Sequence, residues 1–299
     1  MSGKWGVVNV SAAAVSTVRN WRLSTSSEPK TFIASNTKGG TGRRPAVLDW
    51  AGNYQQYAKI PTVMPGSGGL FAGYVGPTNG TPGTAGPIMS GTFICENIQV
   101  VINWGGAELI TITTNFLGND ILTRSEGVVA FDTSIPSVFP SGLGKFEIAK
   151  AIATPVYSAI CSTQATLNIL AQMLPYSDSC TYDATKGMMI RKRVSGAIDW
   201  NLSVVCDDIA SFVSPPVVVG DLVLVKLWVD TTNFWDLKYG IVENVSDFTV
   251  DRETGALISY TLNISMCADN GTIMGSITLP GAGTPWWPVT GASLLEVEE

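Results

Sequence analysis

Apolar and polar residues alternate along much of this chain, which is the pattern of strands with one buried face. In residues 257–266 the alternation runs from Ile258 to Met266, where every second residue is apolar and most residues between them are polar. A period of two places apolar side chains on one side of a strand. The pattern predicts a mainly β protein with antiparallel sheets that are buried on one face and polar on the other.

Two pairs of such segments are joined by turn residues and are predicted to form β-hairpins. Residues 96–104 and 108–116 meet at Gly105-Gly106, and residues 242–250 and 257–266 meet at a polar cluster, residues 251–255. Further strands are predicted at residues 15–24, 31–35, 46–50, 165–173, 197–205 and 222–230.

Helical signal is sparse, and the best candidates are two short segments. Residues 50–59 follow an Asp-Trp pair, although Gly52 and Asn53 weaken the start, and residues 207–213 follow Asp207, which is suited to capping a helix. We therefore expect two tandem β-sandwich or partly closed barrel domains, each with one short helix.

The chain contains an internal repeat, because several short anchors recur in the same order. They are Gly3-Lys4-Trp5 with Gly144-Lys145-Phe146, Leu48-Asp49-Trp50 with Ile198-Asp199-Trp200, Glu96-Asn97-Ile98 with Glu243-Asn244-Val245, and residues 106–110 with residues 255–258. Four collinear matches at nearly constant spacing indicate a tandem duplication. The predicted organisation is a first domain at residues 1–122, a linker at 123–143, a second domain at 144–279 and an extended C-terminal tail at 280–299.

The composition favours a protein whose surfaces are covered by copies of itself. Hydrophobic residues make up 45% of the chain and charged residues only 14%, well below the charge of an ordinary soluble domain. A low-charge surface rich in Ser, Thr, Asn and Gly is the alternative explanation. The net charge of −6 argues against binding to phosphate backbones. No apolar run is long enough to predict membrane insertion.

The residues offer little for catalysis. The chain has no His, its five cysteines form no C-x-x-C pair, and its glycine clusters lack the Lys-Ser/Thr ending of a phosphate loop. The acidic groups around Asp207 and Asp247 lack a calcium-loop pattern. We expect no catalytic, cofactor or metal site and free, mostly buried thiols, and we predict that the protein is not an enzyme.

Two basic clusters occupy equivalent places in the repeat and are the main candidate site. They comprise Lys38, Arg43 and Arg44 in the first unit and Lys186, Arg191, Lys192 and Arg193 in the second. Three interpretations stay open: nucleic-acid contact, a solvated loop tip, and docking onto an acidic surface of another subunit, where charge fixes register. Trp286 and Trp287 in the tail are predicted to dock against a neighbouring subunit or, alternatively, to stack on a sugar.

These features resemble the tail tube (major tail) proteins of long-tailed bacteriophages. The matching residues are Asp49-Trp50-Ala51-Gly52, the Pro65-Gly66 turn and a hairpin ending at residues 115–119. In the second unit Asp199-Trp200 is kept, but Asn201-Leu202 and Met266-Cys267-Ala268 depart from the pattern. The resemblance covers most of the first unit and about two thirds of the second.

The resemblance implies a structural subunit whose two units replace two single-domain subunits. Three chains would then form a pseudo-sixfold ring, and rings would stack into a tube that viral DNA crosses without specific binding. The two basic clusters would contact neighbouring rings or subunits. The implied partners are further copies and the sheath, terminator, baseplate and tape measure proteins, in a virion tail synthesised in the host cytoplasm.

Two other functions fit the same sequence. A tail terminator or baseplate hub would form single rings that do not stack. A carbohydrate-binding β-sandwich module would use Trp286 and Trp287 as its sugar platform.

Overall fold

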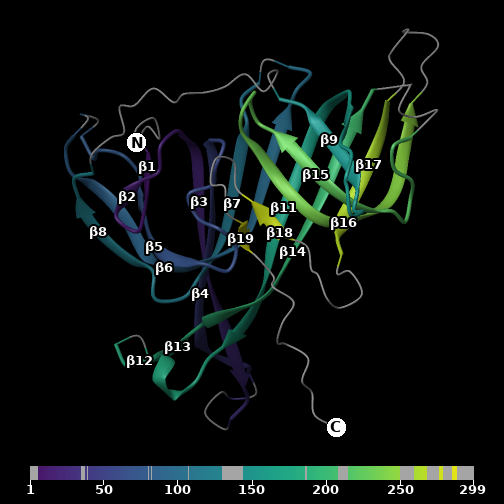
Figure 1. The fold of residues 1–299 in the computed structure, drawn as a ribbon. Helices are drawn as coiled ribbons and strands as arrows, with labels where there is room; N and C mark the ends of the chain where they lie inside the picture. Colours follow the sequence, from purple (N-terminus) through teal and green to yellow (C-terminus); the bar gives the residue numbers. More distant parts are fainter. Residues whose placement is uncertain are drawn as a thin grey trace.

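The structure is a computed structural model, and it shows a mainly β protein built from two units that lie side by side (Figure 1). It describes residues 6–34, 38, 40–79, 81, 83–106, 108–129, 144–185, 187–207, 215–249, 259–267, 276–278 and 285–287. The predicted mainly β class is confirmed.

Along the chain, the first unit comprises β1 to β8 and the second comprises β9 to β19. The first unit contains β1 (Val7–Val10), β2 (Ala13–Ala14), β3 (Val18–Phe32), β4 (Gly42–Tyr57), β5 (Gly68–Tyr74), β6 (Gly86–Asn103), β7 (Thr111–Gly118) and β8 (Thr123–Gly127). The second contains β9 (Phe146–Lys150), β10 (Ser158–Ile160), β11 (Ser162–Tyr176), the 3-10 helix η4 (Ser179–Thr181), β12 (Tyr182–Asp183), β13 (Met188–Ile190), β14 (Lys192–Cys206), β15 (Leu222–Trp228), β16 (Phe234–Thr249), β17 (Ser259–Met266), β18 (Ser276–Thr278) and β19 (Pro285–Trp287).

The pairings of one unit repeat those of the other. The pairs β1–β5, β3–β4, β4–β7, β5–β6, β6–β7 and β6–β8 correspond to β9–β15, β11–β14, β14–β17, β15–β16, β16–β17 and β16–β18. Strands β6 and β16 are long enough to belong to two layers, because one half pairs with β5 or β15 and the other with β7 or β17. Each unit therefore bends over buried apolar residues, and those of the two units belong to one continuous core cluster.

A shared irregularity explains one of the sequence anchors. The β6–β7 register shifts between Cys95 and Asn97, and the β16–β17 register shifts between Val242 and Asn244. The extra residue is Glu96 in one unit and Glu243 in the other. A bulge of this kind bends a strand locally, so the repeated Glu-Asn pair marks the place where each long strand changes layer.

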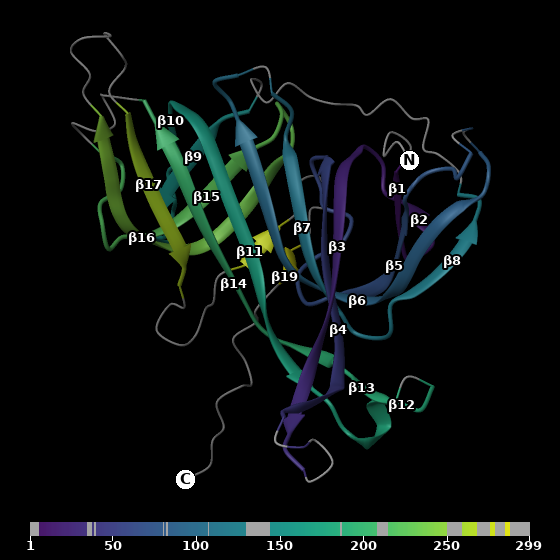
Figure 2. The same cartoon turned by 180° about the vertical axis from the view of Figure 1, so that it is seen from behind.

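Eight strands join into a continuous run across both units, in the order β3-β4-β7-β6-β11-β14-β17-β16 (Figure 2). Their inward residues are apolar and buried, among them Ile98, Ile112, Ile169 and Leu262. Burial of such side chains stabilises a fold by about 1.5–3 kcal/mol each. The opposite face of the run carries amide and hydroxyl side chains, among them Gln55, Thr113, Asn168 and Asn201.

The strand pairing of both predicted hairpins is confirmed, although the turn expected at residues 251–255 lies outside the described residues. The helix expected at residues 50–59 is wrong. Residues 50–57 belong to β4, which pairs with β3 on one side and β7 on the other. Trp50, Tyr54 and Gln56 are buried on one face, so the period is two rather than that of a helix. Residues 208–213 of the second expected helix lie outside the described residues, and Asp207 follows β14 without helical structure.

Three boundaries also differ from the sequence interpretation. Residues 18–32 form one long strand rather than two, which gives β3 an arm that extends beyond the sheet. Strand β8 pairs with β6, whereas the sequence predicts a linker at these residues. Strand β19 pairs with β18, whereas the sequence predicts an extended tail there.

Candidate assembly interface

The two units are joined by direct strand pairing. Residues 97–103 of β6 pair antiparallel with residues 164–170 of β11, from Asn97 opposite Leu170 to Asn103 opposite Gln164. Near this junction the Gly105 N–H donates to the carbonyl of Thr163 at 3.0 Å. The junction continues the hydrogen-bonded sheet from one unit into the next.

Amide side chains reinforce the junction on its polar face. Gln99 donates to the side-chain oxygen of Asn168 at 3.1 Å, and Asn168 donates to Asn201 at 3.0 Å. These three residues come from β6, β11 and β14, so the bonds cross both the unit boundary and the next strand pair. Side-chain pairs across strands stabilise a sheet by about 0.2–1 kcal/mol each.

The strand edges that correspond to this junction lie at the two ends of the run. Trp50 and Trp200 are equivalent residues of the repeat, and they pair with Thr25 and Ile169, respectively. Residues 20–26 of β3 therefore correspond to residues 164–170 of β11. Residues 244–249 of β16 correspond to the paired part of β6. Among the described residues, this part of β3 pairs only with β4, and this part of β16 only with β17. The β16 edge thus corresponds to the β6 side of the β6–β11 junction, and the β3 edge corresponds to its β11 side.

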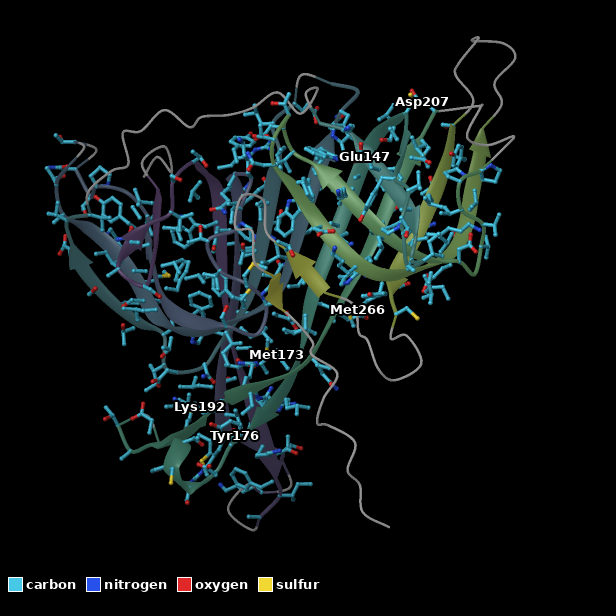
Figure 3. All side chains as sticks on the ribbon, in the orientation of Figure 1. Glu147, Met173, Tyr176, Lys192, Asp207 and Met266 are labelled. Carbon is cyan, nitrogen blue, oxygen red and sulfur yellow. The ribbon has the colours of Figure 1, made fainter. Side chains whose placement is uncertain are left out.

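Below the sheet, the long ends of β3 and β4 form one arm, and the ends of β11 and β14 form another with β12 and β13 (Figure 1). Strand β13 pairs parallel with β4, with Met189 opposite Val47 and Ile190 opposite Leu48. Tyr176 and Lys192, which face each other in the second arm, lie together in this lower region (Figure 3). The arm of the second unit is therefore docked on the arm of the first.

Two arginines of the second basic cluster hold the arms together. Arg193 donates to Asp49 Oδ2 at 2.6 Å and to the Gly118 carbonyl, and its side chain is only 7% exposed. Its backbone N–H donates to Asn119 at 2.6 Å. Arg191 contacts Glu28 at 2.6 Å and Asp49 at 3.4 Å. Removing one partner of a charge pair this well enclosed strongly destabilises the fold, because the other charge stays buried without a partner.

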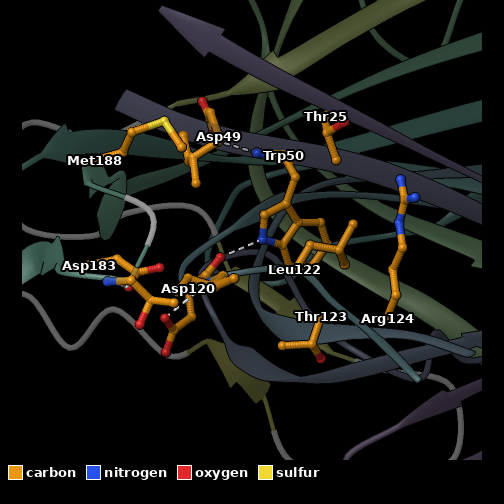
Figure 4. Close-up of a pocket in the computed structure, with 12 residues that line it drawn as sticks. Thr25, Asp49, Trp50, Asp120, Leu122, Thr123, Arg124, Asp183 and Met188 are labelled. Atoms are coloured by element: carbon orange, nitrogen blue, oxygen red, sulfur yellow. Dashed lines mark hydrogen bonds between the residues drawn. The ribbon is translucent and has the colours of Figure 1, made fainter. Parts of the chain in front are cut away.

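Beside this contact lies a groove of about 760 Å³ between the first unit and the docked arm (Figure 4). The acidic side chains Asp49, Asp120 and Asp183 line it together with Arg124. The carboxylate of Asp120 lies 3.4 Å from Lys192, and Asp49 is bound by arginine. Two of the three acidic side chains in the lining, Asp49 and Asp120, are thus paired with the second basic cluster.

A further ion pair joins the units away from the arms. Lys59 Nζ lies 2.5 Å from Asp230 Oδ2, and the Asp230 side chain is 7% exposed. Asp230 also accepts hydrogen bonds from the backbone N–H groups of Thr232 and Asn233, both at 2.7 Å. Although burial raises the pKa of Asp230, the bonds from Lys59 and Asn233 outweigh it and hold that pKa well below its ordinary value.

The other residues predicted to form contacts are placed differently. Arg43 and Arg44 are exposed on β4, and the Arg44 guanidinium lies 5.9 Å from the centre of the Phe32 ring. Lys38 is exposed with a φ of 49°. Lys186 lies outside the described residues, as do the side chains of Trp286 and Trp287 in β19. Contact of the two basic clusters, seven residues in all, with a neighbouring ring stays a prediction. Three of the seven, Arg191, Lys192 and Arg193, have partners within the chain.

Sequence reasoning missed the acceptors of the basic cluster. Asp49 appears in the sequence only as part of a repeated anchor, whereas in the structure it lies inside β4 and binds two arginines. Glu28 and Asn119 gave no signal of their own. The repeated Asp-Trp pair was the only available pointer: Asp49 and Asp199 each accept a bond from the next backbone N–H, at 2.8 and 2.7 Å.

No protein-family model and no curated protein matches the chain. Within the described residues, no helix has the length and apolar character needed to cross a membrane. No group of three or more potential metal ligands occurs in the part of the chain that the structure describes.

Proposed function

We propose that this chain is a structural subunit of a bacteriophage-type tail tube. Three copies form a ring with pseudo-sixfold symmetry, and rings stack around a channel through which viral DNA passes. Its partners are further copies and other tail proteins such as sheath, terminator, baseplate and tape measure proteins, in a virion tail. One observation carries the proposal: the chain contains a unit-to-unit strand junction and carries the two halves of another at its free edges.

Head-to-tail pairing of these edges favours closure. The β6–β11 contact is heterologous, because different surfaces of the two units meet, and repetition of such a contact produces a ring when the rotation closes. Closure also removes the exposed edges of β3 and β16, which would otherwise pair with other chains. Three two-unit chains supply six units, which matches the ring expected from the resemblance.

The polar face of the eight-stranded run suits the wall of a channel. Amide side chains bond to one another on it, including Asn115 with Asn97 at 2.9 Å and Asn263 with Asn244 at 2.6 Å. Nucleic-acid affinity comes mainly from clustered Lys and Arg. A face rich in amides and hydroxyls therefore supports passage of DNA without specific binding.

Electron microscopy of the purified chain, combined with sedimentation velocity, tests the proposal. We expect trimers and stacked tubes at high protein concentration. Isolated rings that never stack would instead support a tail terminator or baseplate hub. A chain that stays monomeric at every concentration would contradict assembly altogether.

A further inference from the structure

The arm contact within the chain provides a template for a contact between chains. Arg193 and Arg43 occupy the same position in their hairpins. In each hairpin the repeated Trp pairs with one residue of the partner strand, and the Arg pairs with the residue six places further along that strand. The pairs that establish this are Trp200–Ile169 with Arg193–Pro175, and Trp50–Thr25 with Arg43–Thr31. Arg43 is therefore the first-unit counterpart of Arg193.

The acceptor has a counterpart as well. Asp49 and Asp199 precede the repeated Trp residues, and in both the Oδ1 atom accepts the backbone N–H of that Trp. Within the chain, Asp49 Oδ2 is the atom that binds Arg193. The equivalent residue Asp199 is exposed, and among the described residues it has no cationic partner.

We infer that Arg43 of one copy binds Asp199 of the next and repeats the Arg193–Asp49 contact between chains. The inference rests on the proposed ring. If the β16 edge of one copy pairs with the β3 edge of another as β6 pairs with β11, the first arm of the second copy lies on the second arm of the first copy. Arg43 then reaches Asp199 as Arg193 reaches Asp49.

This assignment gives the two basic clusters different tasks. Arg191 and Arg193 fix the arms within a chain, whereas Arg43 links chains within a ring. The exposed state of Arg43 and Asp199 in a single chain follows directly, since each is one half of a pair whose other half belongs to a neighbour. Opposite charges at such a contact fix register and exclude wrong partners.

A charge exchange tests the pair. The variants are Arg43→Glu, Asp199→Arg and the double variant Arg43→Glu/Asp199→Arg, and sedimentation velocity over a concentration series measures ring assembly. Each single reversal should raise the protein concentration needed for half-assembly by at least about tenfold, because attraction becomes repulsion. The double variant should return this concentration to within about threefold of the wild-type value, because the opposite charges are restored.

Lys30→Glu is the matched control, because it reverses the charge of another exposed residue on the same arm. Lys30 pairs with Arg44, and the corresponding residue of the second unit is Leu174, which pairs with Val194. This control should assemble within about threefold of wild type. Circular dichroism should show an unchanged fold for every variant, since the altered side chains are exposed.

The outcomes separate this pair from the proposed function. If wild type assembles and Arg43→Glu assembles equally well, or if the double variant is not rescued, the Arg43–Asp199 contact is wrong while the ring stands. If Lys30→Glu is impaired as strongly as Arg43→Glu, general charge rather than this pair controls assembly. A wild-type chain that never assembles contradicts both proposals.

Discussion

The two units share one backbone plan but fill it with different side chains. In the first unit Phe93 lies opposite Gly118, whereas in the second the corresponding pair is Gly240 opposite Met266. The large and small residues have exchanged strands. In each unit the ring of the repeated Trp lies over the glycine: a Cβ added at Gly118 would collide with Trp50, and one added at Gly240 would lie 2.7 Å from the Trp200 ring.

The surroundings of the two indoles differ in the same way. Trp50 belongs to an aromatic cluster in which Phe71 and Phe116 lie 4.9 Å apart, and its Nε1–H donates to the Asp120 carbonyl at 2.6 Å. Trp200 is fully buried, and its Nε1–H finds no hydrogen-bond acceptor within the described part of the structure. Strand pairing and bulge position are therefore kept by the backbone pattern, while each core reaches close packing by its own arrangement.

Replacing either Trp should produce the largest loss of stability. We expect Trp50→Ala and Trp200→Ala each to lower the free energy of unfolding by about 4 kcal/mol, because a large buried ring is lost. The Phe variants sharpen the comparison: Trp50→Phe should cost about 1 kcal/mol more than Trp200→Phe, since only Trp50 loses a hydrogen bond. Urea unfolding measures both, and equal costs for the Phe variants would contradict the difference.

The next largest effect concerns the arms. Arg193→Ala should lower the free energy of unfolding by about 3 kcal/mol, because it leaves the half-buried Asp49 without its closest cation. Arg43→Ala should change monomer stability by less than about 0.5 kcal/mol, because Arg43 is exposed. Chemical denaturation under conditions where the chain is monomeric compares them. Similar losses in the free energy of unfolding for the two variants would contradict the difference between a buried Arg193 and an exposed Arg43.

The ion pair between the units should have a smaller, pH-dependent effect. Asp230→Asn should lower the free energy of unfolding by about 2 kcal/mol at pH 7, because charge-assisted bonds are lost. Since the pKa of Asp230 is lowered in the folded chain, its contribution is present above the unfolded value of about 3.9 and disappears as the pH falls toward the folded pKa. Urea unfolding at pH 7 and at progressively lower pH should therefore show the two proteins converging, and a constant gap would contradict the assignment.

The amide bonds across the junction should contribute least. Asn168→Ala removes bonds to Gln99 and Asn201 and should cost about 1 kcal/mol. Asn115→Ala, which loses the bond to Asn97 inside one unit, is the comparison and should cost about half as much. Thermal unfolding followed by circular dichroism resolves differences of this size, and a larger loss for Asn115→Ala would count against a special role of the junction.

Local features of the fold were predictable from the sequence, whereas contacts between distant segments were not. Alternation at residues 257–266 and the turn at Gly105 identify the hairpins, because strand period and turn chemistry are local properties. The β6–β11 junction depends on which strand edges meet, and neighbouring residues carry no signal for that. Residues 50–57 were misread because Gly52 and Asn53 interrupt the alternation, yet pairing on both sides keeps this segment in a sheet.

The residues of the candidate site were predictable from the sequence, but their partners were not, because the partners lie on distant segments. The repeated basic clusters were visible as sequence, but their separate tasks follow from exposure and partners. Arg193 is buried against Asp49, while Arg43 is exposed. Identical residue types at equivalent places can thus serve contacts within one chain and contacts proposed between chains.

A disulfide cross-link tests the central claim most directly, namely that the β16 edge of one copy pairs with the β3 edge of the next. By correspondence with Asn97 and Leu170, Asn244 should face Ser26 of the neighbouring copy. The variant Ser26→Cys/Asn244→Cys, made with Cys161→Ser and Cys180→Ser to remove the exposed thiols, should oxidise to a ladder that ends at a cross-linked trimer on a non-reducing gel. A ladder that continues beyond three chains, or no cross-link in assembled protein, would contradict the account.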